Sequence, residues 1–95
     1  MAQDARITVH LPATLRECCG GASRLEVPAS NLRALLEALE RSHPALHRSL
    51  CDERGIVRRH VNLFVNAAHM RDRGGLDAPL APGDVVSIIP AVSGG

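Results

Sequence analysis

Histidine and cysteine side chains offer the widest choice of covalent and metal chemistry in this 95-residue chain. His43, His47 and Cys51 are spaced four residues apart, so a helix through them would place three metal ligands on one face. Pro44 disfavours a helical backbone at His43, and the set has no fourth protein ligand for a tetrahedral ion. We therefore expect no metal site.

The three cysteines, Cys18, Cys19 and Cys51, give no indication of an activated or bridged thiol. None has the CxxC spacing of structural zinc sites and thioredoxin-like pairs, and no orienting carboxylate or oxyanion motif accompanies Cys51. All eleven basic residues are arginines. This excludes Schiff-base chemistry, and it excludes attachment of a protein modifier to a lysine of this chain.

The last two residues, Gly94 and Gly95, are the strongest chemical signal in the sequence. They follow a predicted strand and Pro90, so we expect residues 91–95 to form a flexible C-terminal tail. Because glycine lacks Cβ, this pair can pass through a narrow channel and present a terminal carboxylate to an active site. Adenylation by ATP would make that carboxylate an acyl donor for a thiol, a persulfide or an amine.

Composition predicts one globular domain, residues 1–95, that binds neither nucleic acid nor a membrane. The formal net charge is +1, and the single Phe without Tyr or Trp disfavours a base-stacking surface. Apolar runs are too short to span a membrane, and no signal peptide is visible at the N-terminus. Together with the unpaired cysteines, these features lead us to expect a cytoplasmic protein.

Alternating apolar and polar residues predict four strands, and spaced leucines predict one main helix. The strands span residues 6–11, 24–27, 61–66 and 84–89. The helix follows a cap at Ser30 or Asn31, buries Leu32, Leu35, Leu36 and Leu39, and ends near His43. A short helical piece over 44–50, a turn over 66–69 and an irregular stretch anchored by Leu76 and Leu80 complete the chain. A short glycine-containing connection joins the first two strands.

This order of elements predicts an α+β fold of the β-grasp, ubiquitin-like kind. The helix would lie across one face of a small mixed sheet in which the first and last strands are central and adjacent.

Three segments resemble the prokaryotic ubiquitin-like sulfur carriers. They read VNLFVN at 61–66, LAPGDVV at 80–86 and IPAVSGG at 89–95. The group includes the molybdopterin synthase small subunit, the thiamine-pathway carrier and the actinobacterial carrier of cysteine biosynthesis. The last segment and the long linker over 49–60 are most similar to the cysteine branch.

The resemblance implies a carrier that acts with partner enzymes and is not itself an enzyme. An E1-like enzyme would use ATP to adenylate Gly95, and sulfur would then convert the carboxylate to a thiocarboxylate. Val92, Ser93 and Gly94 would thread into partner active sites together with Gly95. The acceptor would be a PLP-dependent cysteine synthase, followed by a metalloprotease that releases cysteine, or the large subunit of molybdopterin synthase. The chain itself would bind no cofactor.

The outer sheet face is where partners should dock. Alternation places Phe64, the only aromatic residue, on that face with Ile89. His10 and Pro12 become their neighbours if the first and last strands pair. Two arginine-containing segments, Arg58–His60 and 71–73, are candidates for a basic rim that meets an acidic partner.

Two alternatives to a sulfur carrier of cysteine biosynthesis remain open. One is the molybdopterin synthase small subunit, and the other is a protein modifier conjugated to amines through Gly95. A third class is a β-grasp binding module whose tail has no chemistry; it would tolerate loss of the last two residues.

Overall fold

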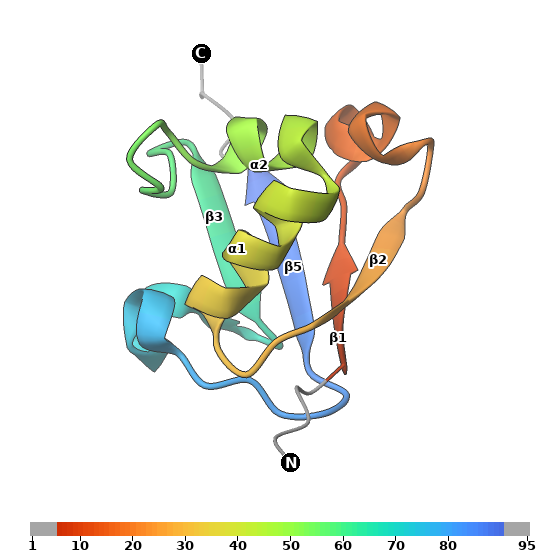
Figure 1. Cartoon of the computed structure of the whole chain (residues 1–95). Coiled ribbons are helices and arrows are strands. Elements are labelled where there is room, and N and C mark those ends of the chain that lie inside the picture. The colour runs from red at the N-terminus through yellow and green to blue at the C-terminus, as the bar shows by residue number, and fades with distance from the viewer. Residues whose placement is uncertain (1–5, 91–95) are drawn as a thin grey trace.

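The computed structural model describes residues 6–90 of the chain and contains one mixed sheet with helices on one face (Figure 1). The strands are β1 Arg6–His10, β2 Arg24–Pro28, β3 Val61–Val65, β4 Ala68–His69 and β5 Val85–Pro90. The α-helices are α1 Leu32–Ser42 and α2 Pro44–Leu50, and the 3-10 helices are η1 Ala13–Cys19, η2 Met70–Arg73 and η3 Gly75–Asp77.

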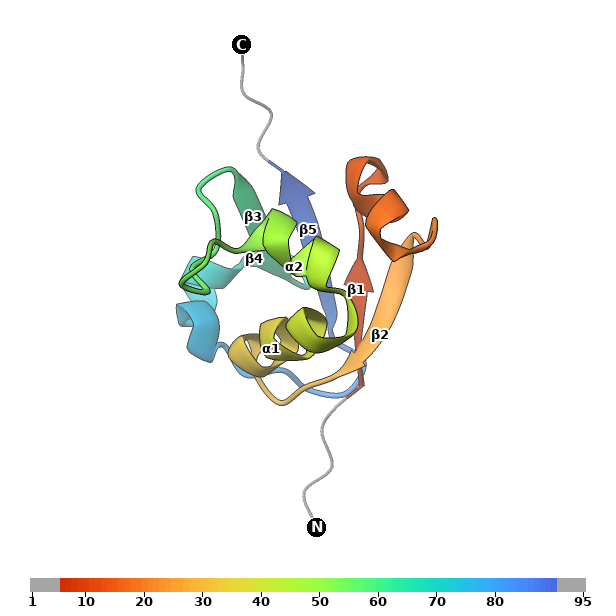
Figure 2. The same ribbon diagram turned by 45° about the horizontal axis from the view of Figure 1, so that its top comes forward.

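The strand order β2-β1-β5-β3-β4 confirms the predicted β-grasp topology. β1 pairs with β5 in parallel, and the remaining pairs are antiparallel. The first and last strands are therefore adjacent inside the sheet, as expected. The same view turned by 45° shows α1 and α2 together on one side of the strands (Figure 2). No helix in the described range 6–90 is long and apolar enough to cross a membrane.

The core lies between this sheet face and the helices. Alternate strand residues point into it, and the α1 leucines meet them along a single stripe. The largest side chains with almost no exposed surface are Ile7, Val9, Leu32, Leu35, Leu39, Leu46, Leu50, Cys51, Leu63, Val65 and Val86. The predicted apolar sets of the helices and strands are thus confirmed, since Leu36 and Ile88 are buried as well.

Helix α1 is capped by Asn31, one of the two predicted caps. Asn31 has an extended backbone, and its Oδ1 accepts a hydrogen bond of 2.8 Å from the backbone N–H of Ala34. The helix ends at His43, whose φ of −139° is not helical, and Pro44 then starts α2 as its first residue. This break confirms that His43 leaves the helix.

Two connections differ from the predictions. The link between β1 and β2 is not short, because Ala13–Cys19 form η1 before Gly20 and Gly21 turn the chain back with positive φ. The predicted turn over 66–69 is also shorter than expected. Only Asn66 and Ala67 turn, and Ala68–His69 pair with β3 as the edge strand β4. Asn66 has a φ of 56°, a left-handed conformation that asparagine tolerates better than most residues.

The loop before β5 is fixed by Asp84. Gly83 has a φ of 88°, as the predicted Pro82–Gly83 turn requires, and the N–H of Asp84 bonds to the carbonyl of Ala81. The Asp84 carboxylate accepts the N–H of Ala81 at 2.9 Å and the amide of Asn66 at 3.2 Å. These bonds lower the pKa of Asp84 below its ordinary value, and the bond from the N–H of Ala81 contributes most.

Substitution Asp84→Ala should therefore destabilise the domain in a pH-dependent way. A lowered pKa means that the ionised carboxylate stabilises the folded state above the unfolded pKa of about 3.9 and that this stabilisation is lost as the pH falls further. Urea unfolding should show a clear gap between variant and wild type at pH 7 and a smaller one at pH 3. Asp72→Ala, which changes an exposed carboxylate, is the control. An equal gap at both pH values would contradict the assignment.

Candidate functional site

The sheet face opposite the helices is the candidate docking face, defined by His10, Phe64, Ile89 and the residues between them. Strand register places His10 beside Ser87, and Ser87 beside Phe64. Ile89 lies in the next outward row, beside Asn62, and is 48% exposed. Three of the four residues predicted for docking thus share one face across β1, β5 and β3.

Pro12, the fourth predicted docking residue, lies beyond the end of β1. It is half-buried, has a φ of −69° and caps η1. Because β1 and β5 run parallel, their carboxyl ends meet at the same end of the sheet. Pro12 therefore lies at the end where β5 finishes with Pro90 and where the C-terminal residues begin.

Phe64 points outward as predicted, yet it is half-buried rather than freely exposed. The imidazole of His69 on β4 packs edge-on against its ring, with centroids 5.2 Å apart and planes at 73°. Nδ1 of His69 accepts the backbone N–H of Arg71 at 3.1 Å, so Nε2 carries the proton that it donates to Oδ1 of Asn62 at 3.1 Å. These bonds hold the imidazole in place, which gives the docking face a rigid aromatic centre.

His69 was not predicted as part of this surface, because the sequence pattern placed the residue in a turn. A two-residue strand is too short to show alternation. The available signal was the pair Asn66–Ala67, which suits a tight turn and would return the chain beside β3.

The residues with the strongest chemical signal lie outside the described residues. These are Val92, Ser93, Gly94 and Gly95, and the structure describes the chain only as far as Pro90. Their predicted role in threading and in thiocarboxylate formation stays a prediction.

The thiols and imidazoles do not assemble into a reactive site. Cys51 is 1% exposed, and burial raises the pKa of its thiol, as it does for Cys19. In the range 6–90 no group of three His, Cys, Asp or Glu side chains is placed to hold a metal ion. His43, His47 and Cys51 therefore form no metal site in the described structure.

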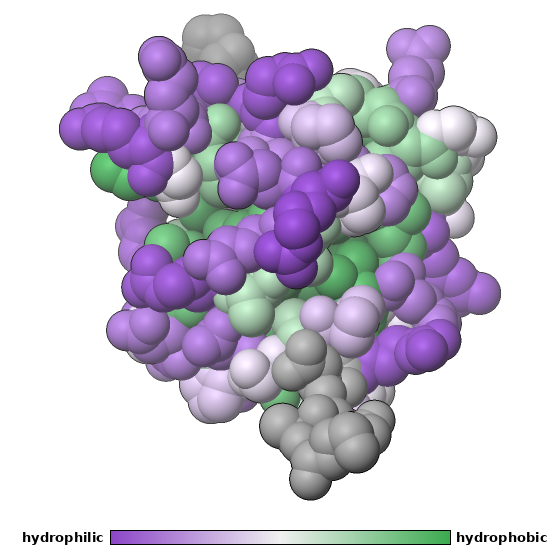
Figure 3. Space-filling view, viewed as in Figure 1, coloured by the Kyte–Doolittle hydropathy of each residue, from purple (hydrophilic) through white to green (hydrophobic). Residues whose placement is uncertain are grey.

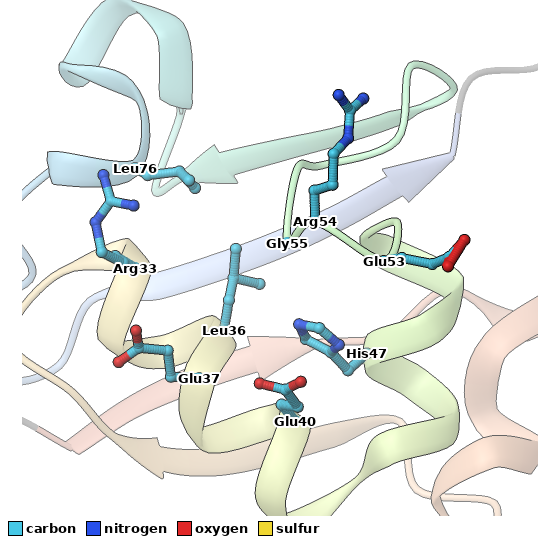
Figure 4. A pocket seen from close by; sticks show the side chains of 9 residues that line it. All are labelled: Arg33, Leu36, Glu37, Glu40, His47, Glu53, Arg54, Gly55 and Leu76. Atoms are coloured by element: carbon cyan, nitrogen blue, oxygen red, sulfur yellow. The ribbon is translucent and has the colours of Figure 1, made fainter.

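A pocket of about 290 Å³ lies on the helix side, among α1, α2 and the loop at residues 53–55 (Figure 4). Leu36 lies among charged side chains of both signs, with Glu40 and His47 on one side and Arg33 on the other. The space-filling view from this side shows a mainly hydrophilic surface with apolar patches between the helices (Figure 3). Among the described residues, no buried side-chain polar atom lacks a hydrogen-bond partner.

Comparison with known proteins identifies the family of this chain. The family model described as "ThiS family" matches residues 9–95. The chain belongs to the ThiS family. Its members are ubiquitin-like sulfur carriers, which confirms the resemblance seen in the sequence.

Relatives of this ThiS-family chain include named sulfur carriers. The sulfur carrier protein CysO of Mycobacterium tuberculosis is 36% identical over 91 residues, which cover 94% of this chain and 98% of the relative. The crystal structure of M. tuberculosis CysO superposes with a TM-score of 0.83 at 35% identity, over 90% of this chain and 99% of that one.

Two further structures extend the comparison. CysO in the Amycolatopsis orientalis BexX/CysO complex has a TM-score of 0.84 at 32% identity, over 94% of this chain and 99% of that one. The small archaeal modifier protein 1 of Methanosarcina acetivorans has a TM-score of 0.84 at 30% identity, over 99% of this chain and 100% of that one. Carriers and a modifier thus share this fold.

In this ThiS-family chain, Phe64→Ala should weaken partner docking more than it weakens the fold. Loss of the edge-on contact with His69 should lower the free energy of unfolding by about 1 kcal/mol. Truncation of a central interface aromatic should cost at least about 2 kcal/mol of binding to a partner enzyme that docks on this face. Urea unfolding and a titration with that enzyme separate the two effects.

Phe64→Leu is the matched control, since it keeps an apolar side chain at the centre of the docking face. A stability loss of about 3–5 kcal/mol in Phe64→Ala would contradict the outward position of the ring. Unchanged affinity for the enzyme would contradict the docking role.

Proposed function

We propose that this chain carries sulfur as a thiocarboxylate at Gly95 and delivers it for cysteine biosynthesis. The observation that supports this most strongly is the near-full-length similarity to CysO sulfur carriers, within a family match that runs through Gly95. The chain would act as a co-substrate of its partner enzymes, with ATP bound by the activating enzyme. Its three free thiols suit a reducing cytoplasm.

The chemistry at Gly95 takes two steps. An E1-like enzyme joins the Gly95 carboxylate to the α-phosphate of ATP and releases pyrophosphate, which turns a poor acyl donor into a mixed anhydride. Hydrosulfide then attacks the acyl carbon, AMP leaves, and a thiocarboxylate remains. A persulfide instead gives an acyl disulfide as AMP leaves; a thiol then attacks the donor's sulfur, which releases the thiocarboxylate and forms a disulfide between that thiol and the donor.

The acceptor is proposed to be an activated serine derivative on a PLP-dependent cysteine synthase. The thiocarboxylate sulfur displaces the activating group from the side-chain carbon, so the new C–S bond links cysteine to the carrier. Acyl transfer to the cysteine amine gives an amide that a metalloprotease hydrolyses. Similarity to two CysO proteins supports this pathway over the molybdopterin pathway.

The pathway is tested by offering the thiocarboxylate form to both acceptors. With a cysteine synthase and an activated serine, the chain should gain one cysteine residue at its C-terminus. With the large subunit of molybdopterin synthase and its pterin precursor, it should keep its sulfur. Sulfur loss only in the second reaction would transfer the proposal to the molybdopterin pathway.

Conjugation to target proteins is the second candidate function. It is favoured by the similarity to small archaeal modifier protein 1 over nearly all of both chains. The absence of lysine means that this chain cannot receive a second copy on a side-chain amine. Higher-mass conjugates formed in cell extract with ATP, and lost when Gly95 is deleted, would support the modifier.

A further inference from the structure

Residues 58–61 lie beside the point where the C-terminal residues leave the sheet. Val61 at the start of β3 is the register partner of Pro90 at the end of β5. Only five residues separate Pro90 from the chain end, and they reach at most about 17 Å when fully extended. An active site that takes Gly95 must therefore bring its mouth within that distance of Pro90. The surface around Val61 lies at this same end of the sheet, beside Pro90.

A pocket of about 400 Å³ opens at this end of β3, between the loop before it and η2 after β4. We call it the tail-root pocket. Its apolar lining residues are Ile56, Val57, Val61 and Met70, and its charged or polar ones are Asp52, Arg58, Arg59, His69 and Arg71. Ile56 is 51% exposed and, with Ile89, is one of two large hydrophobic side chains that lie exposed among residues 6–90. The fold thus brings together two arginine-containing segments that are separate in the sequence.

The pocket is cationic because its single carboxylate is already engaged. Asp52 accepts the backbone N–H groups of Arg54 at 2.8 Å and Ile56 at 3.0 Å, and it pairs with the Arg54 guanidinium at 3.6 Å. The bond from Ile56 contributes most to a lowered pKa of Asp52, so this carboxylate stays ionised and bound within its own loop.

The arginines of the pocket have free hydrogen-bonding capacity. Nε of Arg58 donates to the carbonyl of Arg48 at 2.9 Å, which anchors this side chain at the end of α2. Arg59 and Arg71 are exposed and pair with no carboxylate among residues 6–90. His69 belongs both to this pocket and to the docking face, so the two surfaces are continuous.

We propose that the tail-root pocket docks onto the mouth of the activating enzyme's active site, where an apolar side chain of that enzyme enters between Ile56 and Met70 and acidic side chains face Arg59 and Arg71. This inference rests on the proposed function, because it assumes that an enzyme takes the tail. Reach limits the mouth to the surface around Pro90, to which the pocket is joined through Val61, and the cationic lining of the pocket favours an acidic mouth.

The test is steady-state ATP–pyrophosphate exchange by the cognate activating enzyme, with the full-length chain as the varied substrate. The double variant Arg59→Glu/Arg71→Glu should raise KM about tenfold or more at low salt, with kcat within about twofold, because rim charges act on encounter. Ile56→Ser should raise KM by a smaller factor. The KM of the wild-type chain should rise with salt, and that of the double variant should change little.

Arg59→Glu is also measured alone, and Arg41→Glu on α1 is its matched single-charge control, since Arg41 is exposed and lies in a different pocket. Thermal unfolding of each variant checks that the fold is kept. A KM within twofold of wild type in the double variant would overturn the inference. So would an equal increase in Arg41→Glu, which would show an effect of net charge alone.

A contact between two copies of the chain could also cover the tail-root pocket, and sedimentation of the free chain detects it. Loss of a dimer in the double variant would overturn the inference.

Deletion of Gly95 is assayed in parallel. If that deletion abolishes exchange while the arginine variants match wild type, the proposed function stands and the tail-root docking fails. If wild type supports no exchange, both fail.

Discussion

Deletion of Gly95 should abolish adenylation of this chain while leaving the folded domain intact. The residue that carries the reacting carboxylate would become Gly94, and the tail would be one residue, about 3.3 Å, too short to place it at the α-phosphate of ATP. A misplacement of even 1 Å can reduce a reaction rate about a hundredfold. Pyrophosphate exchange by the activating enzyme is the readout.

The matched control is Ala91→Gly, which changes the tail without altering its length and should keep exchange near the wild-type rate. Thermal unfolding of the deletion variant should match wild type, because residue 95 lies five residues beyond β5. Exchange that survives the deletion would show that the Gly95 carboxylate is not the acceptor of AMP.

Leu39→Ala should destabilise the domain by about 3–5 kcal/mol, one of the largest stability changes that we expect from a single substitution in α1. Leu39 is 1% exposed and is the last of the four buried leucines of α1, so its removal leaves a cavity that water does not fill. A domain of this size has little stability to spare, so a large fraction of the variant should unfold near physiological temperature.

Leu36→Ala is the matched control on the same helix. Leu36 is 5% exposed and borders the pocket between α1 and α2, where solvent can enter the space that it leaves. Its cost should therefore lie near 2 kcal/mol, at the lower end of the range for a buried leucine. Urea unfolding measures both variants, and an equal or reversed order would contradict the arrangement of α1 against the sheet.

Periodic segments of the sequence were sufficient to predict most of the fold. The leucines of α1 recur at helical spacing, and Asn31 and Pro44 bound the helix by local chemistry that needs no tertiary contact. Val61, Leu63 and Val65 alternate with outward residues, which made the direction of Phe64 predictable.

The remaining features depend on contacts between distant residues. The 3-10 helix η1 has no fully buried residue, and its partly buried Leu15, Cys18 and Cys19 cover little more than one turn, which is too short a pattern to distinguish a helix from a loop. The contact of His69 with Phe64 requires the register of β4 against β3. The tail-root pocket likewise needs Arg59 and Arg71 on one surface, although twelve positions separate them in the chain.

The central claim is that Gly95 carries sulfur, and intact-mass spectrometry of the chain tests it most directly. The full-length protein is incubated with its activating enzyme, ATP and sulfide, and the C-terminal fragment is then sequenced by tandem mass spectrometry. We predict a mass gain equal to the replacement of one oxygen by one sulfur, confined to Gly95 and absent without ATP. An unchanged mass despite consumption of ATP, or a sulfur located on Cys18, Cys19 or Cys51, would contradict the claim.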